Sequence, residues 1–370
     1  MKQIVLIAML DSVHTVRWLR NWQSWDEVEI TLIPSGPHRR IHPDLSSLLQ
    51  PEGPVRVIKG ASFFGGFFSF AMDKFFGTEL QLRYLRQATF SLANSSYFLH
   101  YLETQHSGYL ALKFLRQHRP DVVVGSNWGS DLYWFRRFEP HRKKITELLE
   151  KTDRYLVECE RDYEFAKELG FGGQTTIVGP NSFIHQPRLG LSKENLIVLK
   201  GYQGWAGLSH TALRALARAR SQLENFKIVV YSASLRTRIY AKLLGVVFSL
   251  DIASYPKHFF NQHEMLQLFA RSRIYIGASR TDGISTSALE AMNQGALPIQ
   301  TNTSCFQNIV NKGVIGFAPA PTEEELYFSI KSALQLIERD NEYIQKNDRT
   351  LRNFASEAVA RRRFLFAYDL

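Results

Sequence analysis

Two acidic residues, Asp282 and Glu290, lie eight positions apart in the segment DGISTSALE, which has the residue types best suited to chemistry. Gly283 stands between a predicted strand and a predicted helix. The hydroxyl and backbone N–H groups of the first helical turn would come from Ser285, Thr286 and Ser287. Because a helix N-terminus presents N–H groups without intrahelical partners, it is a ready site for an anion. We therefore predict that this segment binds an anionic ligand.

The same residues also fit a purely structural role. Serine and threonine are common helix caps. In that case Ile284, Leu289 and Met292 would form the core face of an ordinary capped helix. From the spacing alone, the two interpretations have similar weight.

A glycine-rich turn, KGYQGWAG over residues 200–207, offers a second place for an anion after a predicted strand. Gly201 and Gly204 would let the backbone approach a ligand closely. Lys200 is the candidate for a phosphate contact, and Arg280 is the alternative. The competing interpretation of Lys200 is an ordinary surface lysine.

The first half of the chain holds a possible acid–base group made of His14, His106 and Asp131. His106 belongs to QHSG, which opens a predicted helix. Core or capping positions explain these residues equally well.

Several other chemistries lack their motifs in this sequence. There is no HExxH and no paired Cys/His spacing for zinc, and no GxSxG for a serine hydrolase. Neither GxxxxGK[ST] nor a clean GxGxxG occurs, which disfavours ATPases and nicotinamide-dependent dehydrogenases. We therefore expect no metal and no cofactor.

The elements expected around these residues alternate between strands and helices. Predicted strands are 3–9, 29–33, 55–58, 121–125, 155–158, 195–199, 227–231, 274–277 and 297–300. Predicted helices are 14–22, 108–118, 143–151, 162–169, 211–223, 263–270 and 285–295. This alternation implies parallel sheets covered on both faces, and 370 residues favour two domains. The predicted fold is α/β, with two Rossmann-like doubly wound domains that face a central cleft and a linker near residues 180–192.

The segment DGISTSALEAMNQGALPIQTNTS resembles the E-x(7)-E segment of the retaining family-four glycosyltransferases. The resemblance implies that Asp282 contacts the donor sugar and that Glu290 binds the ribose. It also implies that the amides of Gly283, Ile284 and the following hydroxyl residues bind the diphosphate. One departure is that Asp282 stands where the family usually has glutamate, so its side chain is one methylene shorter.

Other segments resemble the same family. The turn 200–207 is similar to the first turn of the donor domain, although no arginine lies between Gly201 and Ser209. NWGSDL resembles the family's HGxD-like stretch, with Trp128 where histidine is usual. DSVHTVRW stands at the loop that usually faces the acceptor. The residues so implied for the cleft and acceptor are His14, Thr15, Arg17, Asn127, Trp128 and Asp131.

The resemblance implies a GT-B fold with domains at 1–182 and 183–353, and a C-terminal helix at about 354–370 that crosses back to the first domain. It implies retaining, metal-independent transfer from a nucleotide-diphosphate sugar to a saccharide or lipid-linked saccharide in cell-surface polysaccharide assembly. The catalytic candidates are Asp282, Lys200 and His106. A sugar-nucleotide epimerase and a non-catalytic binding subunit stay open as alternatives.

The formal net charge of +10 suits an anionic partner. No nucleic-acid-binding motif occurs, so we expect no nucleic acid. Residues 63–76 combine phenylalanines with the cation Lys74, which suits an anionic membrane surface or a buried core. With two cysteines, no secretory signal and no membrane span, we expect a cytoplasmic protein, peripheral on the inner face of the membrane if the phenylalanines are exposed.

Overall fold

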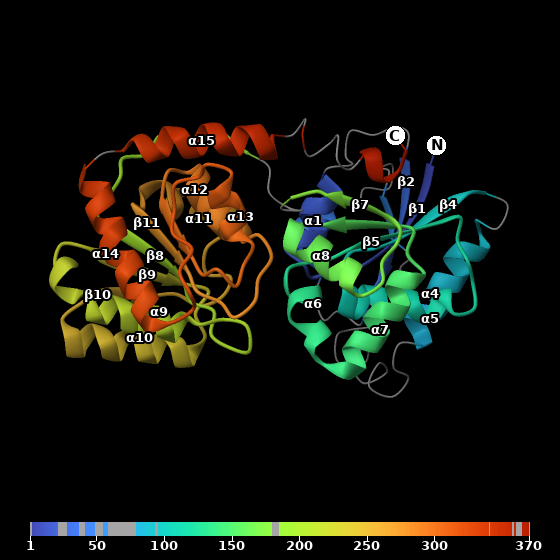
Figure 1. Ribbon diagram of the computed structural model, residues 1–370, viewed down its shortest axis with the longest axis horizontal. Helices are drawn as coiled ribbons and strands as arrows, with labels where there is room; N and C mark the ends of the chain where they lie inside the picture. The colour runs from blue at the N-terminus through green and yellow to red at the C-terminus, as the bar shows by residue number, and fades with distance from the viewer. Residues whose placement is uncertain are drawn as a thin grey trace. The chain divides into compact units, whose positions relative to one another are not determined.

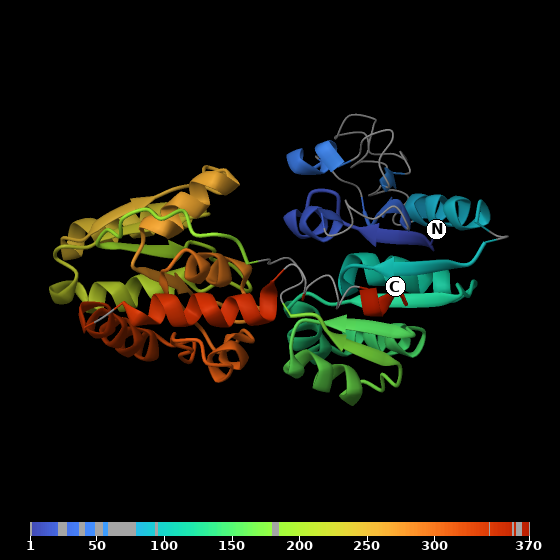
Figure 2. The same ribbon diagram turned by 90° about the horizontal axis from the view of Figure 1, so that it is seen from above.

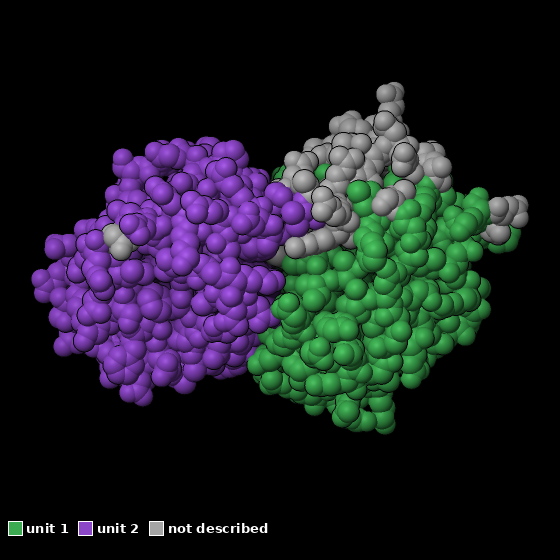
Figure 3. All heavy atoms as spheres, turned by 45° about the horizontal axis from the view of Figure 1, so that its top comes forward, with its two compact units in different colours: residues 1–182, 361–370 green, residues 183–360 purple. Residues whose placement is uncertain are grey.

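The structure is a computed structural model that describes residues 2–20, 28–36, 41–48, 55–57, 79–92, 95–179, 185–339, 341–356, 359 and 365–369. It divides into two compact units, coloured in Figure 3. Unit 1 comprises Met1–Ser182 and Arg361–Leu370, and unit 2 comprises Phe183–Ala360. The phenylalanine segment 63–76 lies outside the described residues. Among the described residues, no helix combines the length and the apolar character needed to cross a membrane.

Unit 1 is built on a parallel sheet with the strand order β3-β2-β1-β4-β5-β6-β7 (Figure 1). Its strands are β1 (Lys2–Ala8), β2 (Val28–Pro34), β3 (Val55–Val57), β4 (Tyr97–Tyr101), β5 (Val122–Ser126), β6 (Arg154–Val157) and β7 (Gln174–Ile177). Its helices are α1 (Val13–Arg20), α2 (Pro43–Leu48), α4 (Glu79–Phe90), α5 (Tyr109–Leu115), α6 (Ser130–Tyr133), α7 (Glu139–Glu150) and α8 (Glu160–Glu168). A π-type turn, Thr104–Gly108, precedes α5, and a 3-10 turn, Phe135–Arg137, precedes α7.

The central strand β1 shows why this sheet is covered on both sides. Ile4 and Leu6 belong to one apolar cluster, whereas Val5 and Ile7 belong to another. Because successive side chains of a strand point to opposite faces, the run of apolar residues supplies two cores at once.

The end of the chain is anchored in unit 1. The Tyr368 hydroxyl group is hydrogen-bonded to His100 Nδ1 on β4. Arg154 on β6 donates to the Ala367 carbonyl at 2.9 Å, and Lys2 Nζ donates to the Asp369 carbonyl at 2.9 Å. The expected return of the C-terminus to the first domain is confirmed.

Unit 2 is built on a second parallel sheet with the strand order β10-β9-β8-β11-β12. In Figure 2 this unit is coloured from green through yellow to red. Its strands are β8 (Leu196–Lys200), β9 (Lys227–Tyr231), β10 (Asp251–Ser254), β11 (Ile274–Gly277) and β12 (Leu297–Gln300). Its helices are α9 (Ser209–Arg218), α10 (Leu235–Phe248), α11 (Gln262–Arg271), α12 (Thr286–Asn293), α13 (Phe306–Asn311), α14 (Glu323–Arg339) and α15 (Glu342–Ala355). A 3-10 turn, Arg220–Gln222, follows α9.

Both sheets have the strand order of doubly wound α/β proteins, so the predicted fold class is confirmed. In each sheet the order reverses between two central strands, β1 and β4 in unit 1 and β8 and β11 in unit 2. Ligands of such sheets bind beyond the carboxyl ends of the strands at this switch point. Functional residues are therefore expected at these two places.

Candidate active site

Three predicted residues of unit 2 interact electrostatically near the switch point between β8 and β11. Lys200 ends β8, Asp282 lies in the loop after β11, and Glu290 lies in α12. Burial alone would lower the pKa of Lys200, but the charges of Asp282 and Glu290 raise it above its ordinary value. The side chain of Lys200 is therefore a positively charged ammonium group that interacts electrostatically with both carboxylates. The structure brings together residues that are far apart in the sequence.

The turn between β11 and α12 is held by short contacts. Asp282 Oδ1 accepts a hydrogen bond from the Gly283 amide at 3.0 Å, and the Gly283 carbonyl accepts one from the Cys305 amide at 2.9 Å. Ser285 is the N-cap residue of α12, but its side chain makes no capping hydrogen bond to the first turn. The N-terminal end of α12, where its dipole is positive, therefore begins at the same edge of the sheet as Lys200.

The glycine-rich turn after β8 is sterically constrained at two of its glycines. A Cβ atom at Gly201 would lie 2.7 Å from the Tyr231 carbonyl oxygen, and one at Gly207 would lie 2.1 Å from the Tyr202 carbonyl oxygen. At Gly204 the nearest atom would be 3.6 Å away, an ordinary contact. Gly201 and Gly207 are thus required by the fold of the turn, whereas Gly204 is not.

Arg280 supports this turn. Its Nη1 atom donates to the carbonyls of Gly204 and Trp205 at 3.1 and 3.4 Å, and its backbone amide donates to the Ala206 carbonyl at 2.6 Å. The side chain proposed as an alternative phosphate contact therefore links the loop after β11 to the loop after β8.

Two buried tyrosines lie at this edge and were not singled out from the sequence. Tyr231 ends β9 and Tyr275 lies in β11, and burial raises the pKa of both hydroxyl groups. Tyr275 is also coupled to the charge of Lys200, which lowers its pKa in part. The available sequence signal was tyrosine, rather than phenylalanine, in two of the predicted strands. The hydroxyl group of Tyr231 interacts electrostatically with Glu290, and that of Tyr275 with Lys200.

Gln300, the last residue of β12, is a further polar group that the sequence analysis missed. Its side chain is buried, and a Cβ atom at Gly277 would lie 2.0 Å from its Oε1 atom. The absence of a side chain at Gly277 therefore makes the room in which the Gln300 amide lies.

In unit 1, Asp131 links the segments that follow β4 and β5. Its Oδ2 atom accepts hydrogen bonds from the amides of Thr104 and Trp128, both at 2.9 Å. Burial and the nearby charge of Glu103 raise the pKa of Asp131 well above its ordinary value. Asp131 thus organises the loops at the switch point of this sheet.

His106 lies in the π-type turn after β4. Its backbone amide donates to the Glu103 carboxylate at 2.8 Å, while its side chain is exposed. The Glu103 carboxylate also accepts hydrogen bonds from the backbone amides of Gln105 and Ser107, at 2.9 and 2.5 Å. Because π-type turns frequently occur at functional sites, this geometry keeps His106 as a candidate.

His14 and Trp128 are brought together although they come from α1 and from the loop after β5. Their ring centroids are 5.0 Å apart, and both side chains are partly exposed. Arg17 is also partly exposed on α1, whereas Thr15 is fully buried. Of these α1 residues, His14 and Arg17 can therefore contact a ligand without rearrangement.

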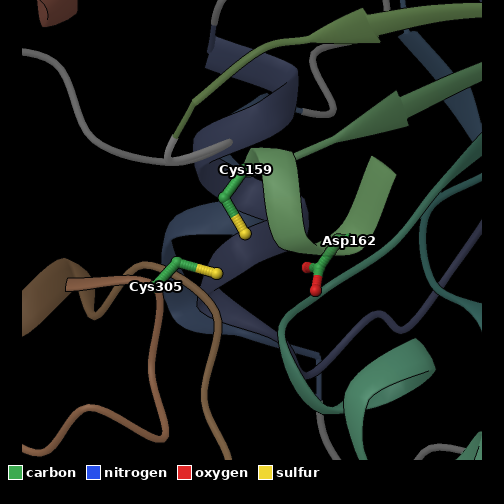
Figure 4. A group of neighbouring side chains, drawn as sticks. All are labelled: Cys159, Asp162 and Cys305. Carbon is green, nitrogen blue, oxygen red and sulfur yellow. The ribbon is translucent and has the colours of Figure 1, made fainter. Parts of the chain in front are cut away.

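The side chain of Asn127 is hydrogen-bonded to a residue of α8. Its Nδ2 atom donates to Asp162 Oδ2 at 2.8 Å, and Arg161 forms an ion pair with the other oxygen of Asp162 at 2.9 Å. Asp162 lies in the first turn of α8, whose N-cap residue is Cys159 (Figure 4). The side chain of Asn127 thus helps to hold the loop on which Trp128 lies.

Comparison with known proteins gives a family match over part of the chain. Residues 210–350 match the family model described as glycosyl transferases group 1. No curated protein sequence matches the chain.

Among solved structures, HepE of Anabaena in complex with UDP and glucose is 13% identical with a TM-score of 0.71, and the alignment covers 100% of both chains. A glycosyltransferase from Rickettsia africae is 14% identical with a TM-score of 0.70, over 100% of this chain and 98% of that one. Sucrose-phosphate synthase from Thermosynechococcus elongatus is 13% identical with a TM-score of 0.70, also over 100% and 98%. These structures share the two-domain fold.

Proposed function

We propose that this chain, whose residues 210–350 match the glycosyl transferases group 1 model, transfers a sugar from a nucleotide-sugar donor to a saccharide or lipid-linked saccharide with retention of anomeric configuration. The acceptor would belong to cell-surface polysaccharide assembly. The observation that carries the proposal is the electrostatic interaction of Lys200 with Asp282, just before α12, and with Glu290, within α12.

The donor is proposed to bind at the carboxyl edge of the unit 2 sheet. Its diphosphate would accept hydrogen bonds from backbone amides of residues 283–287, where the helix dipole favours negative charge. Lys200 would add a positive charge on the other side of the diphosphate. Glu290 would bind the ribose, and Asp282 would contact hydroxyl groups of the sugar.

The chemical step requires that negative charge on the departing diphosphate be stabilised. Preorganised amides and a positively charged side chain supply such stabilisation without reorganisation during the reaction. In this chain these are the first-turn amides of α12 and the ammonium group of Lys200. We assign no protein nucleophile, and the counter-charge in this proposal comes from Lys200 and α12 rather than from a metal.

The acceptor is proposed to bind residues of unit 1. The His14–Trp128 pair offers a polar group and an aromatic face, and Arg17 and the exposed His106 lie on segments that follow the two switch-point strands. His106 would be the candidate for proton transfer. Asn127 and Asp131 would act through the loop geometry that they maintain. The proposed location is the cytoplasm, at the inner face of the membrane if the acceptor is lipid-linked.

A binding screen tests the donor site. Thermal shifts with UDP-, GDP-, dTDP- and CMP-sugars identify the nucleotide, since a ligand that binds only the folded state raises the melting temperature. UDP-sugars are the first choice because HepE was solved with UDP and glucose. Transfer is then measured with a labelled donor and a panel of acceptors.

The matched variants are Glu290→Ala and Glu324→Ala. Glu324 is an exposed residue of α14, so its loss controls for the removal of one negative charge from unit 2. We expect Glu290→Ala to lose most of the nucleotide-induced shift and to fold normally, while Glu324→Ala behaves like the parent. If Glu290→Ala binds every nucleotide as well as the parent does, the assignment of α12 is wrong.

A further inference from the structure

The outward face of α10 is apolar. Leu235, Ile239, Leu243, Val246 and Val247 are between 56% and 75% exposed, and they account for five of the fourteen large exposed hydrophobic residues in the described part of the chain. At 100° per residue these five side chains fall within one third of the helix circumference. They therefore form one continuous stripe, here called the α10 stripe.

The opposite face of α10 is apolar as well. Ala241 and Leu244 are buried in the core of unit 2, with Tyr240 and Phe248 packed partly against the same core. A helix at the surface of a folded unit ordinarily has a polar outer face, whereas the outer face of α10 carries the apolar stripe. In Figure 1, α10 lies at the lower margin of unit 2, below α9. A contiguous apolar patch of this kind marks an interaction surface.

The charged residues of α10 all have the same sign. Arg236 and Lys242 are exposed on α10, and Arg238 is partly exposed on the same helix. The sequence has no acidic residue between Glu224 and Asp251. The surface thus combines exposed aliphatic side chains with cations and has no carboxylate of its own on α10.

We propose that the α10 stripe is a docking surface for an anionic lipid bilayer. The aliphatic side chains would enter the boundary between headgroups and acyl chains, and Arg236, Arg238 and Lys242 would contact anionic headgroups. The helix would lie in the plane of the membrane surface, with its inner face still packed on unit 2. This surface goes beyond the proposed transfer reaction and does not depend on it.

A second copy of this chain fits the surface less well. A twofold interface through the stripe would bring the cations of both α10 helices into one interface, with no acidic residue on either helix to pair with them. A stable interface also needs about 800 Å² from each partner, which is more than a single helical stripe of five aliphatic side chains supplies. The charge pattern therefore favours lipid.

Flotation with vesicles tests the proposal on the full chain. The probe is phosphatidylcholine with or without phosphatidylglycerol, at low and at high salt. The apolar variant combines Ile239→Gln, Leu243→Gln and Val246→Gln, because glutamine is a good helix former and keeps α10 intact. Its control is Phe328→Gln, which removes an exposed aromatic residue from α14.

The charge variant combines Arg236→Gln with Lys242→Gln. Its control combines Lys331→Gln with Arg339→Gln, which removes two exposed cations from α14. We expect binding of the parent only to anionic vesicles, weakened by salt. The apolar variant should bind at least about tenfold more weakly, and each cation lost from α10 should cost about fivefold at low salt. Both controls should bind like the parent.

Three outcomes would overturn the proposal. The first is no binding of the parent to anionic vesicles at low salt. The second is equal binding by the parent and the apolar variant. The third is a parent dimer, seen by light scattering, that becomes monomeric in the apolar variant without any effect of lipid. Nucleotide-sugar binding, measured in parallel, reports on the donor site separately, so a failure here leaves the proposed function untouched.

Discussion

His100 should make the stability of unit 1 depend on pH. This residue is fully buried on β4, where its Nδ1 atom is paired with the Tyr368 hydroxyl group and its Nε2 atom lies 2.8 Å from Ser126 Oγ. Burial lowers the pKa of His100 to about 3. The folded protein therefore keeps this imidazole neutral, whereas the unfolded chain protonates it below a pKa of about 6.5.

The direction and size of the effect follow from the two pKa values. Because the unfolded state binds the extra proton, stability is complete above pH 6.5 and is lost as the pH falls toward 3. The loss from His100 is about 0.8 kcal/mol at pH 6 and about 2 kcal/mol at pH 5, relative to pH 8. Against a typical stability of about 5–15 kcal/mol, a loss of this size is readily measured.

The assay is urea unfolding at pH 8, 6 and 5, followed by tryptophan fluorescence. Five of the six tryptophans belong to unit 1, so the signal reports mainly on that unit. The test variant is His100→Gln, whose amide can still reach a hydroxyl group but does not titrate. Other groups also titrate in this range, and the difference between parent and variant removes their contribution.

The variant should be less stable than the parent at pH 8, because the imidazole no longer fills its site. The gap should then narrow by about 2 kcal/mol between pH 8 and pH 5. His118→Gln, an exposed substitution in unit 1, controls for the loss of a histidine as such. A gap that stays constant from pH 8 to pH 5 would refute the reasoning, since His100 would then titrate equally in both states.

Three further predictions concern unit 2. Lys200→Ala should lower the rate of transfer by about 2–4 kcal/mol of transition-state stabilisation, about 30- to 1000-fold, in a labelled-donor assay; a near-parental rate would move the phosphate contact elsewhere. Asp282→Ala should weaken binding of the nucleotide sugar more than binding of the bare nucleoside diphosphate by calorimetry, and equal losses would contradict a sugar contact. Gly207→Ala should destabilise unit 2 by more than about 1 kcal/mol in urea unfolding, whereas Gly204→Ala should stay within about 0.5 kcal/mol; similar effects at both positions would show that the turn relaxes.

The repeated alternation of strands and helices was enough to predict two parallel sheets. Residues 227–231, 274–277 and 297–300 were predicted as strands with the bounds that the structure shows. Short runs of β-branched residues between glycine or proline signals are local features, and a buried parallel strand needs little else. The fold class could therefore be predicted from single segments.

Other elements were missed because their stability depends on distant residues. Strand β4 has the sequence YFLHY, and its buried histidine is tolerated because Tyr368 comes back from the other end of the chain to pair with it. Helix α10 was missed because both of its faces are apolar, so it lacks the hydrophobic periodicity by which amphipathic helices are predicted. Neither feature is visible in a local window.

In the candidate donor site, too, residues of one local motif were predicted and residues from separate strands were missed. Asp282, Gly283 and Glu290 belong to one continuous motif and were predicted together. Tyr231 and Gln300 were not, because they end separate strands and are brought to the same edge only by the order of the sheet. A sequence motif identifies the charged residues, while the buried polar groups around them depend on the fold.

The structure suggests a physical reason for aspartate, rather than glutamate, at position 282. Its carboxylate holds the Gly283 amide at 3.0 Å, a contact that suits a short side chain because donor and acceptor are adjacent in the chain. The same carboxylate raises the pKa of Lys200, so the shorter acid and the lysine at the end of β8 act on each other. A longer glutamate would extend the carboxylate by one methylene away from that amide. The aspartate therefore fits an arrangement in which one carboxylate both shapes the turn before α12 and keeps Lys200 charged. The positive charge in this arrangement comes from Lys200 at the end of β8, because the turn that follows has no arginine before Ser209.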